Sequence, residues 1–224
     1  MNIILFGASG MVGQGVLREC LLANDVDKVL VVGRSTTGQF HPKLTELAHR
    51  DFTDFTPVRA ALTGYDACFF CLGVSAGGMS EAEYTAITEG YTLAAARTIL
   101  EVNPRSTFIY VSGTRTDSTA KGSTMWARVK GRTENALLAM PFGASFMFRP
   151  GIIRPMHGAV SKTTSYRVGY TLLGPVLPIL QKLMPGSMTT TEAVGRAMLQ
   201  AARGKATRKI LENTDITALA ATSA

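Results

Sequence analysis

The chain of 224 residues has only three cysteines and three histidines, and it has no low-complexity tract or repeat. The absence of repeats and biased tracts excludes solenoid, collagen-like and wholly disordered proteins. Three cysteines cannot build a disulfide framework, so a reducing, cytoplasmic location is expected. Cys68 and Cys71 have C-x-x-C spacing, but in a strand an offset of three places them on opposite faces. The histidines show no ligand spacing, and no metal site is predicted.

Long hydrophobic runs are also missing. The longest late uncharged run covers residues 168–180 and contains Pro175 and Pro178. A spanning helix needs about 20 apolar residues, so this run does not predict one. The uncharged N-terminal stretch lacks a basic segment before it and carries regularly spaced glycines, which does not fit an export signal. Peripheral membrane contact through residues 168–180 remains the weaker alternative.

Positive charge exceeds negative charge, with 23 Lys plus Arg against 16 Asp plus Glu and a formal net charge of +7. The basic residues are scattered, and their small groups lack interleaved aromatic residues or a known reader motif. Nucleic-acid binding is therefore not predicted. A basic ligand pocket or a basic surface explains the excess equally well.

Short apolar runs alternate with segments of helical periodicity along most of the chain. This order predicts an α/β fold, a doubly wound parallel sheet of the Rossmann type with helices on both faces. We expect one domain over residues 1–212, a small helical substrate or lid region at about 154–190, and a poorly ordered tail at 213–224. The predicted strands are 2–6, 28–32, 67–72, 107–111 and 144–148, with a further strand near 208–211. Helices are predicted at 11–22 and near 191–203, and the clearest are those at 81–101 and 125–140.

A glycine-rich turn stands between the first predicted strand and the first predicted helix. Gly7, Gly10 and Gly13 form G-x-x-G-x-x-G, with Ala8 where the commoner G-x-G-x-x-G has its second glycine. At this position backbone N–H groups and the helix dipole bind a nucleotide pyrophosphate. The alternative is a tight turn that binds nothing. The predicted cofactor-binding residues of this turn are Gly7, Ser9, Gly10, Met11, Val12 and Gly13.

The end of the second strand decides which dinucleotide is preferred. Here the strand runs into Gly33-Arg34-Ser35 without a carboxylate. An arginine pairs with a 2′-phosphate, whereas an acidic residue would bind the free ribose hydroxyl, so NADP(H) is favoured over NAD(H). The alternative for Arg34 is a solvated surface residue.

Two further strand ends add expected cofactor contacts. Asp51 and Phe52 follow a predicted third strand, and Leu72 and Gly73 follow the fourth. Asp51 is expected to meet the adenine amino group, with an exposed capping aspartate as the alternative.

Taken together, six segments resemble the short-chain dehydrogenase/reductase superfamily. The resemblance covers residues 1 to about 153 and is closest to its atypical branch, which includes Tat-interacting-protein-like oxidoreductases and NAD-dependent epimerase/dehydratase-like proteins. It rests on Gly7 to Gly13, Gly33-Arg34, Cys71-Leu72-Gly73, Tyr110-Val111-Ser112, Val129-Lys130-Gly131 and Phe148-Arg149-Pro150-Gly151.

The resemblance implies a role for each matching residue. Ser112 would hold a substrate carbonyl, and Lys130 would bind the nicotinamide ribose. Trp126 stands where the superfamily has its catalytic tyrosine, four residues before Lys130. The loop with Pro150, Gly151 and Ile153 would lie against the nicotinamide.

Tryptophan cannot replace the tyrosine as a proton carrier, because an indole N–H does not ionise in the useful range. A reductase would then take its proton from Ser112, water, the substrate or Tyr166. The leading prediction is an NADP(H)-binding oxidoreductase acting on a small apolar carbonyl or related substrate. The alternative is a catalytically impaired NADP(H)-binding redox sensor that acts through a protein partner. Whether the chain forms a homodimer is left open.

Overall fold

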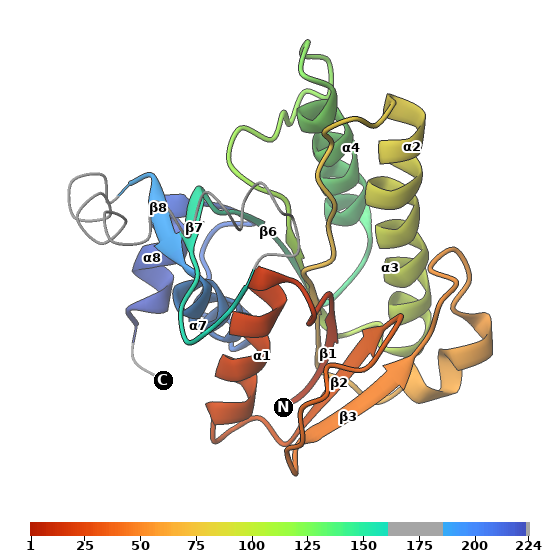
Figure 1. Cartoon of the computed structure of the whole chain (residues 1–224), viewed down its shortest axis with the longest axis vertical. Helices are drawn as coiled ribbons and strands as arrows, with labels where there is room; N and C mark the ends of the chain where they lie inside the picture. The colour runs from red at the N-terminus through yellow and green to blue at the C-terminus, as the bar shows by residue number, and fades with distance from the viewer. Residues whose placement is uncertain (161–185, 223–224) are drawn as a thin grey trace.

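The computed structural model describes residues 1–160 and 186–222, which form three layers (Figure 1). Within these ranges the middle layer is a seven-stranded parallel sheet of order β3-β2-β1-β4-β5-β6-β9. The doubly wound α/β fold predicted from the sequence is confirmed. The strands are β1 (Asn2–Phe6), β2 (Lys28–Gly33), β3 (Leu44–Ala48), β4 (Ala67–Phe70), β5 (Thr107–Val111), β6 (Ala144–Arg149) and β9 (Ile210–Glu212).

The central strands are apolar throughout because both of their faces are covered. In β1 the side chains alternate, with Ile3 and Leu5 packing into one core cluster and Ile4 and Phe6 into the other. All four are fully buried. A parallel strand covered on both faces requires this continuous apolar pattern, in contrast to the alternating pattern of a half-exposed strand.

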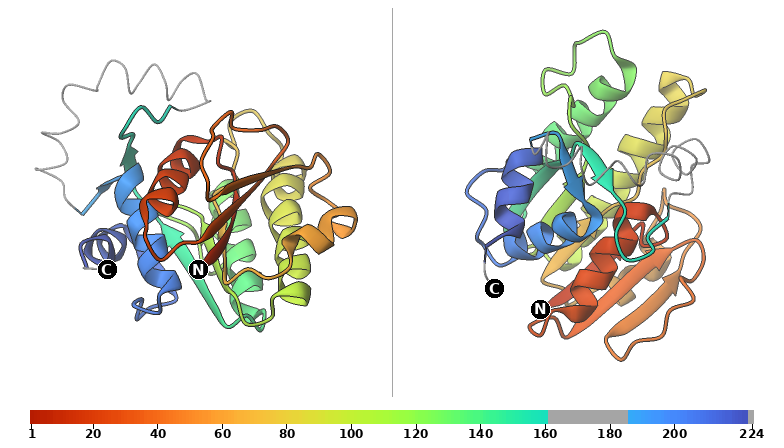
Figure 2. Two further views of the ribbon diagram at one scale, coloured as in Figure 1. Left: turned by 90° about the horizontal axis from the view of Figure 1, so that it is seen from below. Right: turned by 60° about the vertical axis from the view of Figure 1, so that its left-hand side comes forward.

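Helices cover both faces of the sheet, as Figures 1 and 2 show. One face packs against α1, α7 and α8, and the other against α3 and α4, with α2 extending α3. The helices among the described residues are α1 (Met11–Leu22), α2 (Glu81–Thr85), α3 (Tyr91–Val102), α4 (Met125–Ala139), α7 (Thr191–Ala202) and α8 (Asn213–Ala220). A 3₁₀ helix covers Thr56–Leu62, and a π-helical turn at Ala86–Gly90 joins α2 to α3.

Helices α1 and α7 approach each other very closely. A Cβ added at Gly15 of α1 would lie 2.5 Å from the Cβ of Thr191, and one at Gly195 of α7 would lie 2.9 Å from Cγ of Glu19. Only glycine allows the two backbones to approach to this distance. The first helix of the chain is therefore held by a helix from its last quarter.

The expected disordered tail is wrong for the residues of α8. Helix α8 buries Ile216 and Leu219 against the core cluster that also contains α1 and α7. A capping box of Glu212 and Asp215 begins the helix. Two apolar residues three positions apart share one helical face, and this short signal is hidden among small polar residues.

The late region holds a second, two-stranded parallel sheet of β7 (Ile152–Arg154) and β8 (Met188–Thr190). The sequence predicts a loop at β7 and gives no sign of this pairing. Residues 161–185, which include Tyr166 and the apolar run 168–180, lie outside the described residues.

The opposite orientation of Cys68 and Cys71 is confirmed, since each packs toward a different core cluster. Among the described residues, no group of three or more His, Cys, Asp or Glu side chains is arranged to hold a metal ion. No helix in residues 1–160 and 186–222 has both the length and the apolar character needed to cross a bilayer.

Candidate functional site

The predicted site residues follow the carboxyl ends of parallel strands, so the fold gathers them along one edge of the sheet. The order of the strands reverses between β1 and β4, which are parallel neighbours at the centre of the sheet. A doubly wound fold binds its ligand outside the carboxyl ends at this switch point. The residues that leave the strands there are Gly7 after β1, Arg34 after β2, Asp51 after β3, Leu72 after β4, Ser112 after β5 and Pro150 after β6.

The glycine turn is shaped by close backbone contacts. Gly7 has φ of 83°, and a Cβ there would lie 2.6 Å from the backbone nitrogen of Leu72. A Cβ at Gly13 would lie only 2.1 Å from the carbonyl oxygen of Gly7. Gly10 donates its N–H to the same Gly7 oxygen at 2.9 Å. Glycines at 7 and 13 are thus required for packing, and the turn is rigidly placed between β1 and α1.

The N-terminus of α1 is open toward this edge. Gly10 is the N-cap residue and has no side chain to accept from the first-turn N–H groups, and that turn has no acidic residue. Uncapped N–H groups and the positive end of the helix dipole together favour an anion. Ser9 lies just before the N-cap, and Met11 and Val12 are the first two residues of α1.

Gln14 connects the turn to a segment that the sequence does not link with it. Its Nε2 donates to the carbonyl oxygens of Ser9 and Val160, both at 3.2 Å, and its Oε1 accepts from the N–H of Val160 at 3.2 Å. Val160 therefore lies beside the glycine turn. The sequence contains no local signal for this contact, because the partners are 146 residues apart.

Arg34 and Ser35 are exposed just beyond β2. The guanidinium of Arg34 has no hydrogen bond or ion pair with any residue in the described parts of the chain. Its position is the one expected of a residue that meets the adenosine ribose, and the solvated-arginine alternative is equally compatible with its exposure.

Asp51 is exposed and bound to its own turn. Its carboxylate accepts from the backbone N–H of Thr53 at 2.9 Å and from the Thr53 hydroxyl at 2.5 Å, and these bonds lower the pKa of Asp51. This Asx-type turn precedes the 3₁₀ helix. An exposed aspartate that caps its own turn resembles the capping alternative more than an adenine contact. Phe52 is buried beside Phe6 and Phe55, so only its backbone remains for a ligand.

The segment after β4 is open. Leu72 is half-buried behind Gly7, while Gly73 is exposed and has no atom within 4 Å of the place where a Cβ would stand. No packing requirement explains a glycine at position 73. The backbone here is therefore accessible to a ligand at the switch point.

Trp126, Lys130 and Glu134 are spaced one helical turn apart along α4. Trp126 and Lys130 are half-buried. The Lys130 amine donates to the carbonyl oxygen of Ser112, at the carboxyl end of β5. Burial lowers the pKa of this amine from 10.5 to about 8, against the opposing influence of Glu134. Lys130 is thus brought to the predicted site by its own helix.

The Ser112 hydroxyl is buried within a polar network. Its Oγ donates to Glu134 Oε1 at 2.5 Å and lies 3.1 Å from the carbonyl oxygen of Phe148. Glu134 is fully buried and also accepts from the guanidinium of Arg149. In this arrangement the hydroxyl faces the protein interior. The sequence places Ser112 correctly after β5 but does not reveal the carboxylate that binds it.

The loop after β6 is only partly available. The Pro150 carbonyl accepts from the N–H of Thr114 at 2.9 Å. Gly151 donates its N–H to Asn213 Oδ1 at 2.9 Å, and a Cβ there would lie 2.2 Å from the Ser187 oxygen. Ile153 is 9% exposed. Packing therefore explains Gly151, and the buried side chain of Ile153 gives little surface for a nicotinamide contact.

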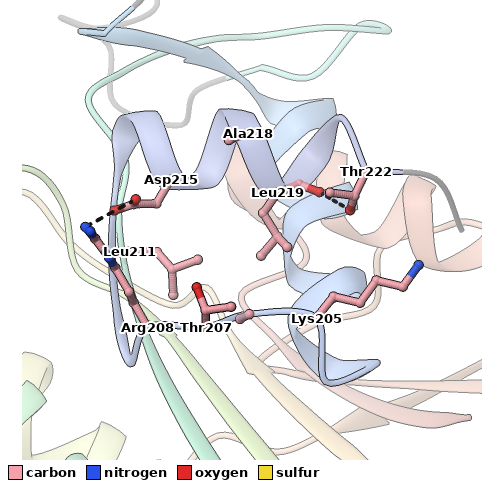
Figure 3. A pocket seen from close by; sticks show the side chains of 9 residues that line it. Lys205, Thr207, Arg208, Leu211, Asp215, Ala218, Leu219 and Thr222 are labelled. Atoms are coloured by element: carbon pink, nitrogen blue, oxygen red, sulfur yellow. Dashed lines mark hydrogen bonds and ion pairs between the residues drawn. The ribbon is translucent and has the colours of Figure 1, made fainter.

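A separate hollow lies between α8 and the loop that leads into β9 (Figure 3). Leu211 and Leu219 line its apolar part, and Arg208 forms an ion pair with Asp215 at 3.6 Å. None of its lining residues is among those predicted to bind a dinucleotide.

Comparisons with known proteins agree with the fold and the motifs. No protein-family model matches the chain. Protein FMP52-2, mitochondrial, from Scheffersomyces stipitis is 28% identical over 152 residues, which are 66% of this chain and 65% of that protein. Protein HTATIP2 from Rattus norvegicus is 25% identical over 155 residues, which are 68% of this chain and 62% of that protein. The match thus spans slightly less than two thirds of the length of these relatives.

Solved structures share the fold of this chain. An oxidoreductase of the short-chain dehydrogenase/reductase family from Burkholderia thailandensis superposes with a TM-score of 0.66 at 17% identity, over 97% of this chain and 92% of that chain. The Bordetella bronchiseptica enzyme WbmF, solved in complex with NAD+, gives a TM-score of 0.68 at 16% identity, over 98% of this chain and 76% of that chain. In its sequence relatives and its fold, the chain resembles the atypical short-chain dehydrogenase/reductase superfamily, as its motifs predict.

Proposed function

We propose that the protein is an NADP(H)-binding oxidoreductase of the atypical short-chain type, which transfers a hydride to or from a small carbonyl or related substrate. The observation that carries this proposal is the uncapped N-terminus of α1 behind a rigid glycine turn at the switch point of the sheet. When bound, the dinucleotide supplies or accepts the hydride at its nicotinamide.

The residues present fit such a group. The Gly7 to Gly13 turn leads into the uncapped N–H groups of the first turn of α1, and Gly73 leaves the facing backbone open. Arg34, exposed and without a partner in the described residues, would hold the 2′-phosphate that distinguishes NADP(H). The structural neighbour WbmF was solved with NAD+, which supports the dinucleotide class but leaves the phosphate preference to Arg34.

Lys130 and Trp126 would face the nicotinamide end. The Lys130 amine lies at the carboxyl end of β5 and has donors left for a ribose hydroxyl. Trp126, one turn earlier on α4, offers a flat ring that stacks on an aromatic ligand. These two residues occupy the positions of the superfamily's Tyr-x-x-x-Lys pair.

An apolar substrate is favoured by the exposed side chains along the same edge. Val74 follows the open segment after β4, Ile152 follows β6, and Val160 is held beside the glycine turn by Gln14. Their exposed fractions are 40%, 53% and 56%. Contiguous exposed apolar patches mark ligand-binding surfaces, and we propose that these three side chains form one.

Fluorescence titration tests the proposal, because Trp126 is the only tryptophan in the chain. Addition of NADPH to the purified protein should quench the indole emission and transfer energy to the reduced nicotinamide. NADH should bind more weakly. Absence of binding by both nucleotides would refute the proposal and leave the glycine turn with a packing role only.

A second candidate function, an NADP(H)-binding redox sensor acting through a protein partner, is favoured by two features of the site. Trp126 provides no general acid, and the Ser112 hydroxyl is bound to Glu134. A sensor predicts tight NADPH binding without oxidation of NADPH by added aldehydes or ketones. Steady NADPH consumption at 340 nm with such carbonyls would exclude a purely sensing role.

A further inference from the structure

The proposed reduction raises the question of which group supplies the proton. Hydride addition to a carbonyl carbon places negative charge on the oxygen, and a positioned acid must neutralise it. The superfamily's tyrosine is replaced by Trp126, and an indole N–H does not ionise in the useful range. Among the described residues at the carboxyl end of β5, the two donors that match the superfamily's site are Ser112 and Lys130.

The Ser112 hydroxyl has a single proton, and that proton is directed inward. The fully buried carboxylate of Glu134 accepts it at 2.5 Å, and the Phe148 carbonyl oxygen lies at 3.1 Å as a second acceptor. A charge-assisted bond to a buried carboxylate is among the stronger hydrogen bonds in proteins. Breaking it to serve a substrate would leave Glu134 with one partner fewer in the interior.

Lys130 is differently placed. Its ammonium group has three protons and donates one to the Ser112 carbonyl oxygen, so two remain. Gly113, with φ of 132°, is the neighbour of this amine, and a Cβ there would lie 3.9 Å from Nζ. Because Gly113 has no side chain, that residue places no Cβ between the half-buried amine and an approaching substrate oxygen.

We propose, building on the function proposed above, that Lys130 Nζ is the direct proton donor to the substrate oxygen. The carbonyl carbon gains the hydride, and the π-electron pair of the C=O bond moves to the oxygen. That oxygen takes a proton from Nζ, and the N–H electron pair stays on nitrogen as a neutral amine. Water then returns a proton to the amine. In the oxidative direction the neutral amine accepts the proton of an alcohol.

The surroundings of Lys130 support this role. Burial lowers the pKa of the amine to about 8, so that both protonation states are accessible near neutral pH. The charged groups behind it are Glu134, on the next turn of α4, and Arg149 of β6, whose charge is paired with Glu134. Glu134 favours the ammonium form and keeps the donor charged at pH 7.

The decisive variant is Lys130→Arg. Arginine keeps a positive charge and N–H donors for a ribose, but it does not release a proton below about pH 12. We expect K130R to bind NADPH within about fivefold of the wild type and to lose at least ~100-fold in the reduction of hexanal or benzaldehyde, the low end of general-acid effects. Trp126→Tyr, added to K130R, should restore part of this loss by supplying a phenol.

Two further readouts separate the possible failures. NMR titration of ¹³C,¹⁵N-labelled lysine, with the Lys130 signal assigned by its absence in K130R, should give a pKa near 8 without any cofactor. A value above 10, or K130R turnover equal to the wild type, would overturn this inference and leave the proposed function intact. A wild type that binds NADPH but reduces neither aldehyde would also overturn it, in favour of a sensor. Failure of the wild type to bind NADPH would instead refute the proposed function.

Discussion

Glu134 of α4 and Arg149 of β6 form an ion pair inside the protein. The Arg149 Nε donates to Glu134 Oε1 at 3.0 Å, and the exposed fractions of the two residues are 0% and 7%. Ser112 donates to the same carboxylate, and Lys130 donates to the Ser112 carbonyl. This pair therefore fixes the backbone at the carboxyl end of β5 and, through it, the position of the amine.

The ion pair should be essential for stability. Glu134→Gln leaves the buried Arg149 charge with one carboxylate, the outer Glu212 at 3.1 Å, beside the Ser118 hydroxyl at 2.6 Å. We expect a loss of about 3–5 kcal/mol in the free energy of unfolding, measured by urea denaturation. Glu212→Gln is the matched control and should cost less than about 1 kcal/mol, because that carboxylate is half exposed. Equal losses in the two variants would contradict the prediction.

Gly13 and Gly73 differ in what an added Cβ would meet, so substitutions there test packing and ligand contact separately. Gly13→Ala forces a Cβ to within 2.1 Å of the Gly7 oxygen, so we expect a loss of more than about 2 kcal/mol in stability and of dinucleotide binding. Gly73→Ala meets no atom within 4 Å and should leave the melting temperature unchanged while weakening NADPH binding. Unchanged NADPH affinity in Gly73→Ala would show that no ligand approaches this backbone.

Arg34 should determine the phosphate preference. Removal of its guanidinium in Arg34→Ala is expected to weaken NADPH binding about tenfold or more and to leave NADH binding within about twofold, since only NADPH has the 2′-phosphate. Arg97→Ala, which removes an exposed arginine from α3, is the charge-matched control. A similar effect on both nucleotides in Arg34→Ala would assign Arg34 to general electrostatic attraction.

Lys130 should make stability depend on pH. The pKa of Lys130 is about 8 in the folded state and 10.5 ordinarily. Below pH 8 the amine is protonated in both the folded and the unfolded state, and its unfavourable contribution to the free energy of unfolding is complete there. Between pH 8 and 10.5 the unfolded state binds more protons, and stability rises with pH. The difference in unfolding free energy between the wild type and Lys130→Met should therefore increase over this interval. A difference that stays constant from pH 7 to 10.5 would contradict the lowered pKa.

Helix α8 should be part of the folded core. Ile216→Ala removes a fully buried side chain that packs with α1 and α7, and we expect a loss of about 2–4 kcal/mol. Thr214→Ala, at an exposed position of the same helix, should change stability by less than about 0.5 kcal/mol. Comparable behaviour of the two variants would mean that α8 does not contribute to the core in solution.

The parts of the fold that depend on local sequence were predictable. The runs at Asn2–Phe6 and Thr107–Val111 are strands with the predicted bounds, because fully covered parallel strands need uninterrupted apolar residues. The predicted helix at 81–101 is helical over Glu81–Val102, with an unpredicted π-helical turn in the middle. The order of these elements was enough to bring the predicted site residues to one edge of the sheet.

Features that depend on distant partners were not predictable. The pairing of β7 with β8 joins segments more than 30 residues apart, and three-residue strands carry little pattern of their own. The orientation of the Ser112 hydroxyl depends on Glu134, which by sequence is an ordinary charged residue on a helix. A buried charge is recognised only once its partner is known, and Arg149 lies on another element.

The contact between α1 and α7 also bears on how the protein is made. Until residues 191–202 have left the ribosome, the face of α1 around Gly15 and Val16 has no helix to cover it. Strands β1 to β6 are complete well before that point, so a nascent chain carries a nearly finished sheet with one apolar surface uncovered. Until α7 is made, this surface remains exposed to water. Release of the complete chain lets α7 dock and completes the support of the glycine turn.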